Sequence, residues 1–151
     1  MKAALNPKHL WHGSISKNKV LKPKMAVDLT GHPDSNLKGV YATDIKELAI
    51  EFGLADKKLH KYADYTKNPV QLVLIEGNIR IGKKFYLHRI KSENFKEMPK
   101  NSHQWFSHKE IKPAEIIELK VDDYKHLVRK ASKKDKEYYY SMIGKFLKEN
   151  D

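Results

Sequence analysis

The order of the periodic segments is the feature that most restricts how this chain folds. Helical spacing of apolar residues (i, i+3, i+4, i+7) occurs early, at Ile45, Leu48, Ala49 and Phe52. A second helical pattern runs from about residue 122 to 149, and strand-like runs fill most of the length between the two. Strands and helices therefore do not alternate. This order argues against a doubly wound parallel sheet and favours an α+β fold with a largely antiparallel or mixed sheet.

The expected strands are short apolar runs bounded by turn residues. They lie at residues 9–12, 39–43, 70–77, 78–82, 83–90, 104–108 and 115–121. Residues 13–38 and 92–103 are expected to form loops, and residues 55–69 are polar without a definite period. Asp44 is expected to cap the first helix, with Glu47 as its capping-box partner and the face of Ile45 buried.

Length and composition restrict the class of protein. A chain of 151 residues favours one domain, spanning residues 1–151, with a basic helical segment from about residue 122. The absence of cysteine excludes a disulfide framework and thiolate chemistry. The first residues contain no apolar stretch of signal-peptide length, and no run approaches the roughly 18 residues of a membrane span. We expect a cytoplasmic protein with no membrane partner.

The charge is strongly positive and unevenly placed. The net charge is +11, and residues 1–27 contain lysines but no acid. The last thirty residues are again rich in lysine. Such a balance attracts polyanions, including nucleic acids and phosphorylated ligands. The alternative is a lysine-rich surface without a partner.

Residues 10–14, LWHGS, place a histidine at the end of an apolar run and a glycine directly after it. A loop that begins at this point is one explanation. The other is a pocket in which the His12 imidazole, the bare backbone of Gly13 and the Ser14 hydroxyl face one ligand. Tyr41, in a second short motif, favours the pocket.

Four segments, in this order and spacing, resemble the ADP-ribosyltransferase-like superfamily in its His-Tyr-Glu branch. They are LWHGS (10–14), GVYATDIKELAIEF (39–52), QWFS (104–107) and IKPAEIIEL (111–119). The branch includes the poly(ADP-ribose) polymerases, diphtheria-type toxins and RNA 2′-phosphotransferases, and the resemblance spans residues 10–124. It implies split antiparallel or mixed sheets with flanking helices, and NAD held as a substrate in a cleft between two small sheets.

The resemblance also implies roles for individual residues. His12 would hydrogen-bond the adenosine ribose, and Gly13 would present its backbone to the nicotinamide carboxamide. Tyr41 would stack on the nicotinamide ring, while Ser14 and Thr43 belong to the same binding motifs. A carboxylate beside the ribose would stabilise the oxocarbenium-like state that forms when the bond to nicotinamide breaks.

The chain departs from the family at this carboxylate. The family places an acid before an aromatic residue on a strand, and here Gln104 precedes Trp105. Glu110, six residues later, would fill the position in a different register; the adjacent tryptophan favours Gln104. Loss of the charge weakens catalysis more than binding. Gln104→Glu is therefore expected to raise turnover of NAD.

Two function hypotheses follow. The first is an NAD-binding ADP-ribosyltransferase-like protein, either a weak mono-ADP-ribosyltransferase or a relative of the 2′-phosphotransferases, acting on a protein, nucleic acid or small molecule. The alternative is a non-catalytic, basic protein of the same fold that binds nucleic acid or another partner. His103 and His108 flank a strand without a third ligand at zinc spacing, so no metal site is expected.

Overall fold

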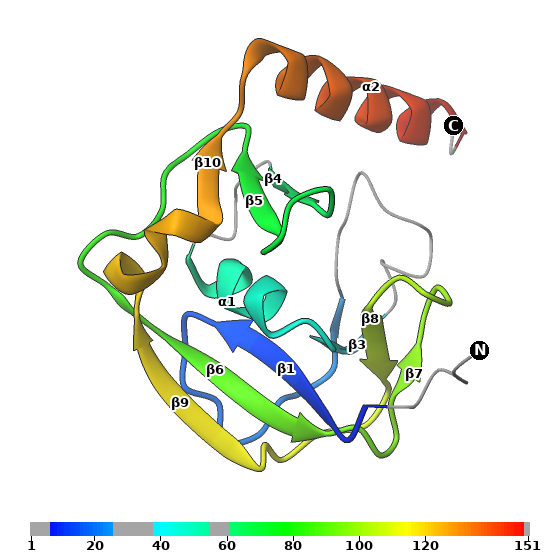
Figure 1. Ribbon diagram of the computed structural model, residues 1–151. Coiled ribbons are helices and arrows are strands. Elements are labelled where there is room, and N and C mark those ends of the chain that lie inside the picture. The colour runs from blue at the N-terminus through cyan, green and yellow to red at the C-terminus, as the bar shows by residue number, and fades with distance from the viewer. Residues whose placement is uncertain (1–6, 26–37, 55–60, 150–151) are drawn as a thin grey trace.

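The computed structural model of the chain describes residues 7–25, 38–54 and 61–149 (Figure 1). In chain order, its elements are β1 (His9–Ser14), β2 (Lys24–Met25), β3 (Lys38–Thr43), α1 (Lys46–Leu54), β4 (Lys61–Asp64), β5 (Gln71–Leu74), β6 (Lys84–Lys91), β7 (Lys96–Glu97), β8 (Gln104–Ser107), β9 (Glu115–Lys120), the 3-10 helix η2 (Val121–Leu127), β10 (Val128–Lys130) and α2 (Lys133–Glu149).

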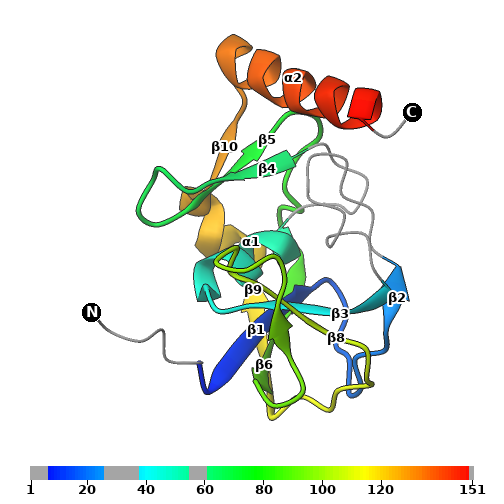
Figure 2. The same cartoon turned by 90° about the vertical axis from the view of Figure 1, so that its right-hand side faces the viewer.

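The strands form two sheets, which confirms the α+β class. The larger sheet has the order β7-β8-β3-β1-β6-β9, with β2 added beside β3, and its neighbours are all antiparallel. The smaller sheet has the order β10-β5-β4, in which β10 is parallel to β5. Helix α1 lies between the two sheets, and α2 covers the outer side of the smaller one (Figures 1 and 2).

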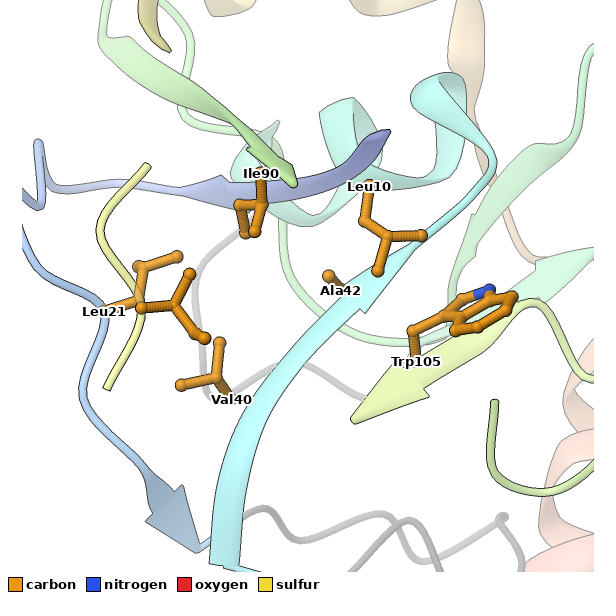
Figure 3. Packing of buried hydrophobic residues seen from close by; sticks show 7 residues of the cluster. Leu10, Leu21, Val40, Ala42, Ile90 and Trp105 are labelled. Atoms are coloured by element: carbon orange, nitrogen blue, oxygen red, sulfur yellow. The ribbon is translucent and has the colours of Figure 1, made fainter. Parts of the chain in front are cut away.

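Each face of the larger sheet has its own core. On the face away from α1, apolar residues of β1, β3, β6 and β8 pack together with Leu21 and Ile111, which lie outside these strands (Figure 3). The strand residues of this cluster are Leu10, Val40, Ala42, Ile90 and Trp105. On the other face, α1 packs over β6 and η2 through Ala49, Ile50, Leu54, Phe85, Leu87, Val121 and Leu127. The alternation of side chains along each strand produces this division.

The smaller sheet divides in the same way. Leu72 and Leu74 of β5 pack with Ile79 and Val128 on one face. Val73 and Ile75 lie on the other, against Tyr139 of α2. Because both faces of β5 are covered, the residues from 72 to 75 are continuously apolar instead of alternating.

A polar network attaches α2 to this sheet. Arg129 of β10 pairs with Asp135 in the first turn of α2 and, at 2.9 Å, with Asp64 at the end of β4. The Tyr62 hydroxyl donates to Asp135 at 3.0 Å. Three separate segments are therefore joined through one guanidinium group.

The expected helix from about residue 122 is wrong in its first part. Residues 121–130 form η2 and then β10, and α2 begins only at Lys133. A capping box sets this start, because the Asp135 amide donates to Ser132 Oγ at 3.2 Å and the Ser132 amide donates to the Asp135 carboxylate at 2.8 Å.

The first helix also differs from expectation. It begins at Lys46, and the Asp44 carboxylate accepts hydrogen bonds from Trp105 and His103 instead of capping it. Leu48 and Ala49 are buried as expected, but Phe52 is 46% exposed. Because α1 packs between two sheets, residues on most of its circumference are buried. A single apolar stripe therefore does not predict which of its residues are buried.

Smaller differences concern the loops. Gly13 and Ser14 belong to β1, residues 61–64 form β4 and residues 96–97 form β7. Residues 78–82 form no strand; they contain a single β-bridge at Ile79 and a turn at residues 81–82. The part of the expected first loop from 26 to 37 lies outside the described residues. Within the part of the chain described here, no helix has the length and apolar character needed to cross a membrane.

Candidate pocket between two diverging strands

A pocket opens where β1 and β3 separate. The register of β1 with β3 consists of the pair Trp11–Thr43, whereas β1 pairs with β6 along its whole length. Beyond that pair the described residues enclose a pocket of about 620 Å³, within the usual size range of ligand sites. Its walls are residues 12–14 of β1, residues 15–24 in part, residues 39–41 at the start of β3, and Phe52 of α1.

His12 bridges the separating strands. Its Nδ1 lies 2.7 Å from the carbonyl oxygen of Tyr41. Because a carbonyl only accepts, Nδ1 carries the proton and donates it. The side chain thus replaces the backbone pairing that β1 and β3 lack at this point, and in the neutral ring Nε2 is the acceptor.

Four residues that the sequence assigned to NAD meet in this pocket. His12, Gly13 and Ser14 line it from β1, and Tyr41 lines it from β3. The Tyr41 ring packs edge-on against Phe106, with ring centroids 5.1 Å apart. Thr43, the fifth residue, is buried, and its hydroxyl accepts the amide of Ile45 at 3.1 Å, so it supports the turn into α1.

Gly13 is required by packing as well as by its place in the pocket. A Cβ atom there would lie 1.7 Å from the carbonyl oxygen of Ala49 and 2.8 Å from its carbonyl carbon. The backbone of β1 therefore touches the backbone of α1. Among the described glycines, positive φ occurs at Gly77 and Gly82 and not at Gly13, so close approach, and not a left-handed conformation, explains this residue.

The pocket lining is aromatic and basic. Phe52 and Tyr41 supply rings, and the exposed residues Lys22 and Lys24 supply positive charge. No acid occurs among the described residues that line it. Such a lining is suited to a ligand that carries both flat rings and negative charge.

The two residues considered for the acidic position lie outside this lining. Gln104 pairs with Thr43 across β8 and β3, and its Nε2 donates to the carbonyl oxygen of Met98 at 2.8 Å. Since side chains alternate along a strand, Gln104 shares a sheet face with Tyr41, two positions along β3. Glu110 is exposed in the loop between β8 and β9.

A group of metal-ligating side chains lies at the β7–β8 hairpin. Asp44, Glu97 and His103 place one ligand atom each within 4.8 Å of the others. All four carboxylate oxygens accept hydrogen bonds, from Trp105 Nε1, from His103 Nδ1, and from the amides of Asn101 and His103. These bonds explain why the three side chains lie together where the turn between β7 and β8 meets the end of β3.

Glu51 of α1 is a buried acid whose surroundings disfavour its charged form. Its side chain is 0% exposed, and neither carboxylate oxygen has a hydrogen-bond partner. Burial, with a smaller contribution from the charge of Glu47, raises the pKa of Glu51 to about 8. Glu51 is therefore mostly protonated in the folded protein at neutral pH.

Three residues of the pocket lining were not predicted from the sequence. Phe52 was expected in the core because it continues the helical period, and Lys22 and Lys24 were seen only as part of the lysine excess. The alternation around Pro23 places these two lysines on one side of an extended segment, a signal that was present in the sequence. Comparison with protein-family models, curated proteins and solved structures finds no significant match for this chain.

Proposed function

We propose that the protein binds NAD in the pocket between β1 and β3, as an ADP-ribosyltransferase-like protein with weak transfer activity or none. One observation carries the proposal. His12, Gly13, Ser14 and Tyr41 come from two motifs about thirty residues apart, and all four line one pocket of ligand size. The resemblance of those motifs to the family and their convergence in space are independent of each other.

The chemistry of the lining supports a dinucleotide. Aromatic rings stack on flat heterocycles, and Tyr41 and Phe52 supply such rings. Lys22 and Lys24 supply the positive charge that a pyrophosphate needs. His12 lines the same pocket, and an imidazole side chain can hydrogen-bond a ribose hydroxyl.

The same lining supports binding more than turnover. Breaking the bond from nicotinamide to ribose generates positive charge, which a nearby carboxylate stabilises. Gln104 has no charge, and its amide group is donated to Met98. We therefore expect the protein to bind NAD but to cleave it slowly or not at all.

Calorimetric titration of the full chain with NAD tests this function. The expected result is a saturable heat and a thermal shift, with ADP-ribose binding comparably and nicotinamide riboside, which lacks the pyrophosphate, binding more weakly. No heat and no thermal shift at millimolar NAD would refute the proposed ligand.

Phe52→Leu is expected to weaken NAD binding by about 2–10-fold, since the stacking of one aromatic ring is worth about 0.5–1.5 kcal/mol. The fold should be unaffected because the ring is 46% exposed. Tyr138→Leu on α2, where the ring is 54% exposed and outside the pocket lining, is the matched control. Equal affinities of the two variants would remove Phe52 from the site.

Gln104→Glu is expected to raise the release of nicotinamide from NAD above that of the wild-type protein. The new carboxylate would lie on the sheet face of Tyr41 and supply the missing negative charge. Gln104→Ala, which removes the same hydrogen bond to Met98 without adding charge, is the control. Equal turnover in all three proteins, with NAD binding intact, would mean that position 104 does not correspond to the family's acid.

A non-catalytic nucleic-acid-binding protein is the second candidate. The net charge of +11 and the two pocket lysines favour it. Its affinity for RNA or DNA would fall steeply with salt through counterion release. Binding that barely changes between low and moderate salt would exclude this candidate.

A further inference from the structure

His88 lies beneath the pocket in the middle of β6 and is completely buried. Two backbone groups contact its ring. The amide of Asn18, in the loop after β1, lies 3.0 Å from Nε2, and the carbonyl oxygen of His12 lies 3.1 Å from Nδ1. The ring thus joins two parts of the pocket wall that are not paired with each other.

These partners determine the protonation of His88. A backbone amide only donates, so Nε2 must accept and cannot carry a proton. A carbonyl only accepts, so Nδ1 must carry the proton and donate it. Both bonds are satisfied only by the neutral ring with its proton on Nδ1, since the doubly protonated ring has no acceptor for Asn18.

The bond to the Asn18 amide affects the pocket because the Asn18 side chain holds together the loop that follows β1. Its side-chain Nδ2 donates to Ser14 Oγ at 3.3 Å and to the Ser16 carbonyl oxygen at 3.1 Å. Asn18 and Ser14 both line the pocket. On the other side, His12 is itself bonded to Tyr41. One chain of hydrogen bonds therefore runs from the loop through His88 and His12 to β3.

We propose that His88 is a positioning residue that holds the loop of residues 15–20 against β1 only while its ring is neutral, so that the pocket forms at neutral pH and loosens in acid. The proposal concerns the pocket, and it rests on the proposed function only where NAD serves as the probe.

The surroundings of the ring favour the neutral state. Burial lowers the pKa of His88 below its ordinary value, an effect that the hydrogen bond to the His12 carbonyl only partly opposes. The His12 ring meets it edge-on, with centroids 5.7 Å apart, and β9 pairs Ile116 with it. The loop contributes only the exposed charges of Lys17 and Lys19. A positive charge on the buried ring of His88 would therefore disfavour the arrangement in which the Asn18 amide donates to it.

Amide resonances of the ligand-free protein test the proposal. At neutral pH we expect a through-hydrogen-bond coupling between the Asn18 amide nitrogen and His88 Nε2, and slow exchange of the Asn18 amide. Both should disappear together as His88 becomes protonated. The amide of Ile45, which a hydroxyl accepts, is the control and should keep its protection. An Asn18 amide that is unchanged while His88 titrates would overturn the proposal.

Two variants add a binding measurement, with NAD as the probe. His88→Phe keeps an aromatic ring but removes both hydrogen bonds, and should weaken NAD binding about tenfold at neutral pH. His88→Gln retains an acceptor and a donor and should recover most of the affinity, without the acid sensitivity of the wild-type protein. Equal affinity of His88→Phe and wild type would contradict the positioning role. If the wild-type protein binds no NAD, the proposed function fails, while the Asn18 measurement still decides the role of His88.

Discussion

Gly13→Val is expected to prevent folding or to destabilise the protein by about 4 kcal/mol or more, a magnitude reserved for severe changes in a core. The added Cβ would lie 1.7 Å from the Ala49 carbonyl oxygen. That oxygen belongs to the backbone of α1, so relief requires the whole helix to move off β1. Chemical denaturation followed by circular dichroism measures the effect.

Gly82→Val is the matched control. Gly82 has φ of 78°, and an added Cβ meets nothing within 4 Å, so only backbone strain is introduced. The expected cost is about 1–3 kcal/mol. Similar stabilities of the two variants would contradict the contact between β1 and α1. The contact also means that Gly13→Val cannot separate a ligand-binding role from a structural one, because both predict lost NAD binding.

The contribution of Glu51 to the free energy of unfolding is expected to fall as pH rises from 4.5 to about 8. In the unfolded chain this acid ionises at its ordinary pKa of 4.5, whereas in the folded protein it stays protonated until pH approaches 8. Between these values the unfolded state binds fewer protons than the folded state, so alkaline conditions favour unfolding. The loss is of the order of 3–5 kcal/mol across the window, at about 1.4 kcal/mol per pKa unit.

Glu51→Gln should remove this part of the pH dependence and should be more stable than the wild-type protein at the alkaline end. Glu47→Gln, an exposed position on the same helix whose charge contributes less than burial to the raised pKa of Glu51, is the control and should keep most of the wild-type slope. The measurement is denaturant unfolding at several pH values, compared between variants so that other titrating groups cancel. Parallel curves for wild type and Glu51→Gln would show that Glu51 does not retain its proton in the folded state.

Most strands of the larger sheet could be predicted because local sequence decides them. β1, β3, β6, β8 and β9 coincide with short apolar runs bounded by turn residues. β10 could not be found this way. It is a basic three-residue segment whose strand conformation comes from parallel pairing with β5, more than fifty residues earlier. A local pattern carries no information about such a partner, whereas the capping box of Ser132 and Asp135 was readable and would have placed the start of α2.

The candidate site was predicted in part for a similar reason. His12, Gly13, Ser14 and Tyr41 lie in motifs that sequence alone brings to attention, and they line one pocket. The pocket lies where β1 separates from β3, with His12 bonded across to Tyr41 and the buried His88 bonded to His12 and Asn18. Those contacts are tertiary, so periodicity could not reveal them.

The proposal that this pocket binds NAD is tested most directly by amide correlation spectra recorded during a titration with NAD. The expected shifts are confined to residues 12–15, 18, 20–22, 24 and 39–41 and to the amides near Phe52, which together form the lining. The amides of β4, β5 and β10 should be unaffected, since these strands form the separate smaller sheet. Shifts that are absent, or that centre on the smaller sheet and leave the lining unchanged, would contradict the proposal.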